Sequence, residues 1–136
     1  MAERLRSVSH LFKLVDACNR CSTVFRIANE RLRDDRFEDF AEHLRQTLDR
    51  FVFELQKEGG RNGAEDLGGP RTYEMKISST NPMVLRVQAC NELQHALEGY
   101  DALLAGGIAG HARAMIRRQR QSLTKFLHDL EYLTAA

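Results

Sequence analysis

The stretch GGRNGAEDLGGPRTYEMKISST, residues 59–80, divides the chain and decides its fold. It holds five of the nine glycines and one of the two prolines, and it shows little apolar periodicity. On either side lies a long segment whose pattern predicts two helices joined by a short turn. The sequence therefore predicts an all-α fold: a four-helix bundle of two antiparallel helical hairpins, joined by one long crossover over residues 59–80.

Length and composition are those of one globular domain spanning residues 1–136. Apolar residues make up 43% and charged residues 29% of the 136 residues, which is ordinary for such a domain. The net charge of +1 gives no general attraction to nucleic acid or to anionic lipid. No apolar run approaches the roughly 18 residues of a membrane span, and no apolar segment of a secretory signal follows the first charges. We expect neither a nucleic-acid nor a membrane partner.

The three cysteines suggest packing rather than chemistry. Cys18 and Cys21 have CxxC spacing, but a closed zinc site needs four ligands, and no second pair follows at a suitable distance. Residues three apart share one face of a helix, so both side chains are expected to pack in the core. The lack of a disulfide framework favours a reducing cytoplasm.

The first hairpin is predicted from apolar residues that recur at steps of three and four. Its first helix is expected over residues 8–32. Asp34 and Asp35 make the turn, and Asp35 followed by Glu38 is similar to a capping box, which predicts Asp35 as the cap of the second helix. Gly59-Gly60 is expected to end that helix. Because the turn is short, the two helices should be antiparallel neighbours.

The second hairpin begins at Asn81-Pro82, with Asn as N-cap and Pro at the first helical position. Gly106-Gly107 is expected to end the third helix. The third apolar stripe consists of Leu85, Ala89, Leu93, Ala96, Tyr100 and Leu103. The fourth consists of Ala112, Met115 or Ile116, Gln119, Leu123, Phe126, Leu130 and Leu133.

The crossover is long enough to change the direction of the chain. A second helix of about 24 residues is roughly 36 Å long, and a linker of about 22 residues reaches up to roughly 70 Å. Short, long, short connections are the ferritin-like pattern, whereas a simple up-down bundle needs only short loops. The length alone leaves open whether the second and third helices run parallel or antiparallel. Tyr73, Met75 and Ile77 are candidates for a small cover over the core.

A family resemblance rests on the order and spacing of several short matches. The second helix ends in FVFELQKEGG, residues 51–60, followed by the acidic Ala64-Glu65-Asp66 and more glycine. The first helix carries Val24-Phe25 and Ala28-Asn29-Glu30 ahead of the Asp turn. Together these resemble an uncharacterised family of small bacterial ferritin-like four-helix-bundle proteins, a domain of unknown function. The resemblance covers residues 8–66 most clearly and returns near His128-Asp129.

One segment departs from that family. The family's third helix has several carboxylates ahead of a Tyr, whereas residues 90–95 ahead of Tyr100 contain one acid, Glu92. The resemblance therefore implies the fold more than an activity.

Glu92 and His95 form an E-x-x-H motif, the spacing by which one helix supplies two ligands in di-iron carboxylate bundles. Glu54, at the edge of the second stripe, is the third candidate ligand. The rest of such a set is largely missing, since Asp16 and Glu30 fall opposite the first stripe and only Asp129 of the last helix approaches its own stripe. A buried carboxylate needs a partner, and for Glu92 we expect Gln119, an Arg or water. The simpler alternative to a metal site is that these side chains make structural polar contacts only.

The remaining chemistry favours a role without catalysis. GGRNG is not a phosphate-binding loop, and no catalytic triad can be placed on helical faces. The basic last helix is expected to present a solvated charged face, with an acidic partner or nucleic acid as the alternative.

Our leading hypothesis is a non-catalytic bundle without a cofactor, acting through self-association or a protein partner. Candidates for its second contact surface are Phe12, Val24, Ile27, Phe53 and Val87. The alternative for some of them is a place in the core, as part of a wide apolar stripe. The alternative is a metal-binding redox or storage protein that holds iron or manganese at Glu92, His95 and Glu54. A third possibility, a small-ligand site between the helices, requires a real cavity.

Overall fold

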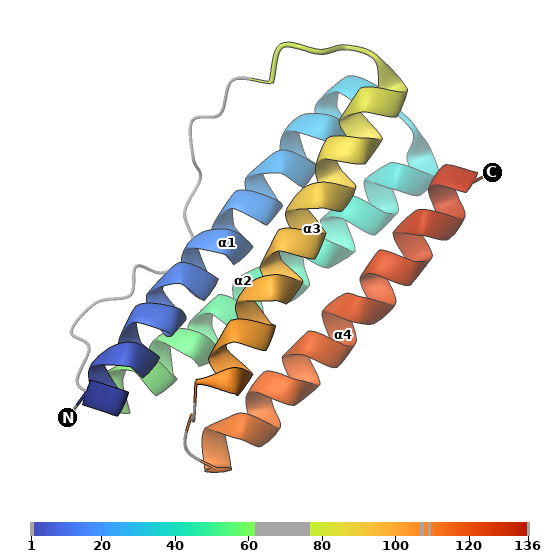
Figure 1. Ribbon diagram of the computed structural model, residues 1–136. Helices are drawn as coiled ribbons and strands as arrows, with labels where there is room; N and C mark the ends of the chain where they lie inside the picture. The colour runs from blue at the N-terminus through green and yellow to red at the C-terminus, as the bar shows by residue number, and fades with distance from the viewer. Residues whose placement is uncertain (1, 62–76, 107, 109, 136) are drawn as a thin grey trace.

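The computed structural model describes residues 2–61, 77–106, 108 and 110–135. These residues form four α-helices: α1 (Ala2–Leu32), α2 (Asp35–Arg61), α3 (Pro82–Ala105) and α4 (Gly110–Ala135). Figure 1 shows them lying side by side as one elongated bundle. The predicted all-α four-helix bundle of two helical hairpins is confirmed.

Contacts at the helix ends show that α2 and α3 run parallel. Arg31, at the end of α1, donates hydrogen bonds to the backbone carbonyls of Ile77 and Ser79, just ahead of α3. Asp34, between α1 and α2, pairs with Arg86 in the second turn of α3 at 3.2 Å. Both α2 and α3 therefore start at the end of the bundle where α1 finishes, and Figure 1 shows them descending together. The direction that the sequence left open is thus settled.

The four helices pack unequally. α1 packs against α2 and most closely against α3, whereas α4 packs against α3 and only loosely against α2. Gly99 of α3 explains the close approach of α1, because a Cβ atom there would lie 3.1 Å from Cδ1 of Leu14. Of the four pairs of helices in contact, α2 and α4 pack most loosely.

The cap of α2 is Asp34 and not Asp35, which corrects the capping-box prediction. One carboxylate oxygen of Asp34 accepts hydrogen bonds from the backbone N–H of Arg36 at 3.0 Å and, more weakly, of Phe37 at 3.4 Å. The preceding Arg33 has φ 49°, the left-handed conformation in which helices often end. That turn of the chain brings Asp34 to the cap position.

We expect Asp34→Ala to lower the free energy of unfolding by about 1–2 kcal/mol, because it removes both the N-cap and the ion pair with Arg86. The matched control is the neighbouring exposed acid, where Asp35→Ala should stay within about 0.5 kcal/mol of wild type. Urea denaturation of both variants measures the difference. Equal losses at the two positions would contradict the assignment of the cap.

The third helix starts and packs as predicted. The side chain of Asn81 accepts from the N–H of Met83 at 2.9 Å, Pro82 occupies the first turn, and Gly106 follows the last helical residue. The six residues predicted for its apolar stripe are its buried residues. The second helix differs slightly, since α2 continues through Gly59 and Gly60 to Arg61 instead of ending at the glycines.

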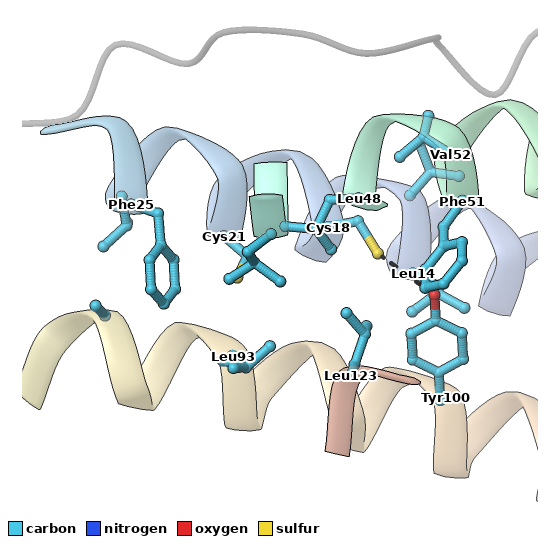
Figure 2. Packing of buried hydrophobic residues seen from close by; sticks show 14 of the residues in the cluster. Leu14, Cys18, Cys21, Phe25, Leu48, Phe51, Val52, Leu93, Tyr100 and Leu123 are labelled. Atoms are coloured by element: carbon cyan, nitrogen blue, oxygen red, sulfur yellow. Dashed lines mark hydrogen bonds between the residues drawn. The ribbon is translucent and has the colours of Figure 1, made fainter. Parts of the chain in front are cut away.

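An aromatic ladder crosses the core at one end of the bundle. The ring of Phe25 stacks on Phe37 at 5.9 Å between centroids and tilts against Phe40 at 6.0 Å. Phe40 in turn meets Phe126 of α4 edge-on at 5.7 Å. Figure 2 shows Phe25 at one end of a row of α1 side chains that face Leu93 and Tyr100 of α3. The ladder links α1, α2 and α4.

Two residues proposed for an outer contact surface are part of this core. Val24 and Ile27 are 2% and 8% exposed, because α1 touches helices on two sides and so has a wide apolar stripe. Ile77 is also buried, as expected for a cover over the core. Tyr73, Met75 and the segment Ala64-Glu65-Asp66 lie outside the described residues. None of the four described helices is apolar over a stretch long enough to cross a membrane.

Candidate functional site

Glu92 lies between α1 and α3 and is held by an arginine. Its Oε1 lies 3.5 Å from a guanidinium nitrogen of Arg20, while its Oε2 is buried without a hydrogen-bond partner among the described residues. An Arg partner for Glu92, expected from the sequence, is thus confirmed. Gln119, the other side chain expected as its partner, instead bonds to Tyr100.

The other two candidate metal ligands lie apart from Glu92. His95 is exposed and pairs with Glu98 of its own helix at 3.7 Å. Glu54 lies at the α2–α4 interface, across the bundle, and pairs with Arg118 at 2.8 Å. The described part of the chain contains no group of three or more His, Cys, Asp or Glu residues placed to hold a metal ion. The structure does not bring the three ligands together, and iron or manganese binding stays a prediction.

A polar cluster is sealed within the core instead. The hydroxyl of Tyr100 donates to Oε1 of Gln119 at 2.7 Å. Sγ of Cys18 lies 3.9 Å from the same hydroxyl, and Figure 2 shows this contact. Nε2 of Gln119 donates to Sδ of Met115 at 3.1 Å and to the carbonyl of Phe51 at 3.4 Å. The cluster joins the helices, and Tyr100 and Gln119 are both 0% exposed, whereas Met115 is half-buried.

The two core cysteines are protonated packing residues. Burial raises the pKa of the Cys18 thiol to about 12, although the hydrogen bond with Tyr100 opposes the shift. Burial, together with the nearby Cys18 and Glu92, raises the pKa of Cys21 well above its usual value. Both side chains are 0% exposed and lie within the hydrophobic core, as expected of packing residues. The packing interpretation of the CxxC motif is confirmed.

The most distinctive surface is the outer side of the first half of α3. Residues 82–94 include two charged side chains, and both are engaged within the chain: Arg86 with Asp34 and Glu92 with Arg20. Every exposed residue of this stretch is uncharged. We call these residues the neutral face of α3: Pro82, Met83, Val84, Val87, Gln88, Asn91 and Gln94.

Three apolar side chains dominate the neutral face. Met83 is 74%, Val87 53% and Val84 40% exposed, and their spacing places them on adjacent turns. Beside them lies a hollow of about 540 Å³ whose lining includes Met83, Val87 and Cys90. Large side chains of this kind, grouped rather than scattered, mark interaction surfaces.

The outer sides of the neighbouring helices differ from the neutral face. The first two turns of α2 expose Asp35, Arg36, Glu38, Asp39 and Glu42. α4 exposes Arg117, Arg118, Lys125, Asp129 and Glu131. In a chain with 29% charged residues, three turns of helix without an exposed charge are therefore a local property of α3.

The sequence analysis identified this surface only in part. Of its five candidates, Phe12, Phe53 and Val87 are exposed, but Phe12 and Phe53 belong to α1 and α2. Met83 and Val84 are not among those candidates. The available signal was the scarcity of charge over residues 82–94.

Comparisons with models of protein families, with curated proteins and with solved structures find no match to this chain.

Proposed function

We propose that this protein is a non-catalytic helical bundle that acts through association, and that the neutral face of α3 is the contact surface for a second copy of the chain. The observation that carries the proposal is the outer side of residues 82–94, whose exposed residues are uncharged and include Met83, Val84 and Val87. The cores of protein interfaces are depleted in charged residues and enriched in Met and large side chains.

A second copy is the occupant that fits this composition. In a two-fold dimer the same patch faces itself, so any charge near the axis meets an identical charge. The neutral face avoids this repulsion, whereas the acidic start of α2 and the basic side of α4 do not. Two antiparallel copies of α3 can interdigitate Met83 and Val87 as neighbouring ridges.

The size of the surface points to a weak dimer. Thirteen residues of helix span only about 20 Å, and one helix pair buries less than the roughly 800 Å² per partner of a standard interface. We therefore expect a reversible equilibrium between monomer and dimer rather than an obligate assembly.

The proposal also includes a relationship to ferritin-like bacterial bundles and a cytoplasmic location. The parallel course of α2 and α3 around one long crossover supports the first, and the free thiols of Cys18, Cys21 and Cys90 support the second.

Sedimentation equilibrium over a wide range of protein concentration tests the proposal. We expect Val87→Glu to weaken the dimer at least about 10-fold, because it places an unpaired charge in the contact. Glu is a good helix former, so the variant should retain the fold. Phe53→Glu is the matched control, since Phe53 on α2 is 57% and Val87 53% exposed.

Two results would count against the proposal. A wild-type protein that stays monomeric at every concentration would exclude self-association. A dimer that Phe53→Glu disrupts and Val87→Glu leaves intact would place the contact on another face.

A further inference from the structure

A carboxylate and an imidazole meet where the last turn of α2 lies beside the first turn of α4. Oε1 of Glu58 lies 3.4 Å from Nε2 of His111. The side chain of Glu58 is only 3% exposed, so its carboxylate is held within the interface, whereas the imidazole of His111 is 62% exposed. The pair therefore brings an oxygen and a nitrogen from two helices together at a place that solvent reaches from the side of His111.

The separation of these two atoms is that of two ligands on one zinc ion. Zinc bonds of about 2.0–2.2 Å in a tetrahedron place neighbouring ligand atoms roughly 3.3–3.5 Å apart. A direct hydrogen bond between a charged imidazole and a carboxylate is typically shorter, at about 2.7–2.9 Å. Glu58 and His111 thus have the spacing of two zinc ligands without any movement of either helix.

A second His–Glu pair of the chain shows what is particular to the first. His95 and Glu98 lie 3.7 Å apart on the same helix, and their side chains are 63% and 77% exposed. An ion bound between them would have to order two mobile surface side chains, at a cost in conformational entropy. Burial already holds Glu58 in place, so a metal ion at His111 would lose less of its binding free energy in this way.

A third ligand is available on the same face of α2. Glu54 precedes Glu58 by four residues, and both line a hollow of about 220 Å³ together with His111. Glu54 is paired with Arg118 at 2.8 Å, so it joins the other two only by leaving this arginine. The side chain of Arg118 is 67% exposed, and exposed ion pairs of this kind are weak.

The charge of the hollow favours a cation. Its described lining contains two carboxylates, Glu54 and Glu58, and one ammonium group, that of Lys57. Lys57 is exposed, and its long flexible stem lets the charge turn toward solvent. The dipoles of the two helix ends have opposite effects on a cation here, because α2 ends where α4 begins. The carboxylates therefore decide the sign of the site.

From this arrangement we infer that Glu58, His111 and Glu54 form a site for one zinc ion, with water completing the coordination. Imidazole and carboxylate are both zinc ligands, and three protein ligands with one water are the usual set of an open zinc site. The ion would join α2 to α4, the most loosely packed pair of helices. Of the metal ligands predicted from the sequence, this site uses Glu54 alone.

Titration of the full-length protein with Zn²⁺ in competition with a chromophoric chelator tests the inference. We expect saturable binding of one ion per chain. His111→Ala should weaken that binding at least about 10-fold, as expected for a disturbed zinc ligand set. His95→Ala is the matched control, because the two imidazoles are equally exposed, and it should leave the affinity unchanged.

Glu54→Gln tests the third ligand, since glutamine keeps the size of the side chain and removes its charge. We expect a loss of about 10-fold, and an unchanged affinity would overturn the role of Glu54. Absence of saturable binding, or equal losses from His95→Ala and His111→Ala, would overturn the site and leave Glu58 and His111 as an ordinary ion pair. Circular dichroism of each metal-free variant confirms that the fold is retained.

The zinc site and self-association can fail separately. The ligands belong to α2 and α4, whereas the neutral face belongs to α3. Val87→Glu should therefore weaken the dimer and leave the affinity for zinc unchanged, and His111→Ala should do the reverse. A loss of zinc binding in Val87→Glu would contradict a site contained within one chain.

Discussion

Phe25→Ala is expected to lower the free energy of unfolding by about 3–5 kcal/mol, the largest effect of any single substitution considered for this chain. Phe25 is 0% exposed and contacts the rings of both Phe37 and Phe40. Its removal loses the transfer free energy of the ring and leaves a cavity at the junction of α1 and α2. The Phe40 ring, which packs edge-on against Phe126, would also lose its contact with Phe25.

The matched control is Phe12→Ala on the same helix, because the side chain of Phe12 is 51% exposed. We expect that variant to differ from wild type by no more than about 0.5 kcal/mol. Urea denaturation followed by circular dichroism measures both values. Phe25→Leu, which leaves a smaller cavity, provides an intermediate value if the alanine variant is largely unfolded. Similar losses at positions 12 and 25 would contradict the packing of α1 described above.

The second large effect is expected in the buried cluster around Tyr100. Gln119→Leu should lower the free energy of unfolding by about 1–3 kcal/mol, because it leaves the Tyr100 hydroxyl without its acceptor in a site that water does not reach. Tyr100→Phe should cost a similar amount, since it leaves Oε1 of Gln119 unpaired. Gln121→Leu, two residues along α4 at an exposed position, is the control and should have little effect.

The double variant Tyr100→Phe/Gln119→Leu separates a hydrogen bond from simple packing. When both partners are replaced by apolar groups of similar shape, no polar atom of the pair is left unsatisfied. We therefore expect the double variant to lose clearly less than the sum of the two single losses in a thermodynamic cycle. Additive losses would show that the two side chains act independently.

The sequence predicts the interior of this bundle better than its surface. The stripe of α3 from Leu85 to Leu103 follows from the period of the helix, and Asn81-Pro82 marks a start that needs no tertiary information. For Val24 and Ile27 the sequence leaves open an outer surface or a wide buried stripe, because the width of a buried stripe depends on how many neighbours a helix has. Periodicity alone cannot give that number.

The details of the candidate sites depend on how far apart the helices lie. Arg20 becomes the partner of Glu92 because Gly99 lets α1 approach α3 closely. A hollow lined by residues of α2 and α4 lies where these two helices pack most loosely. The cap at Asp34 likewise follows from the backbone conformation of Arg33. The sequence alone does not distinguish which of the two adjacent aspartates is the cap.

The unequal packing also bears on the order in which parts of the native structure open. α1 contributes closely packed surface to both of its neighbours, whereas one of the two sides of α4 is the loosely packed interface with α2. Local opening follows the regions with the least buried apolar contact. We therefore expect the local opening with the lowest free energy to be the partial detachment of α4, while α1, α2 and α3 stay packed together. The backbone amides of α4 would then exchange with solvent before those of α1.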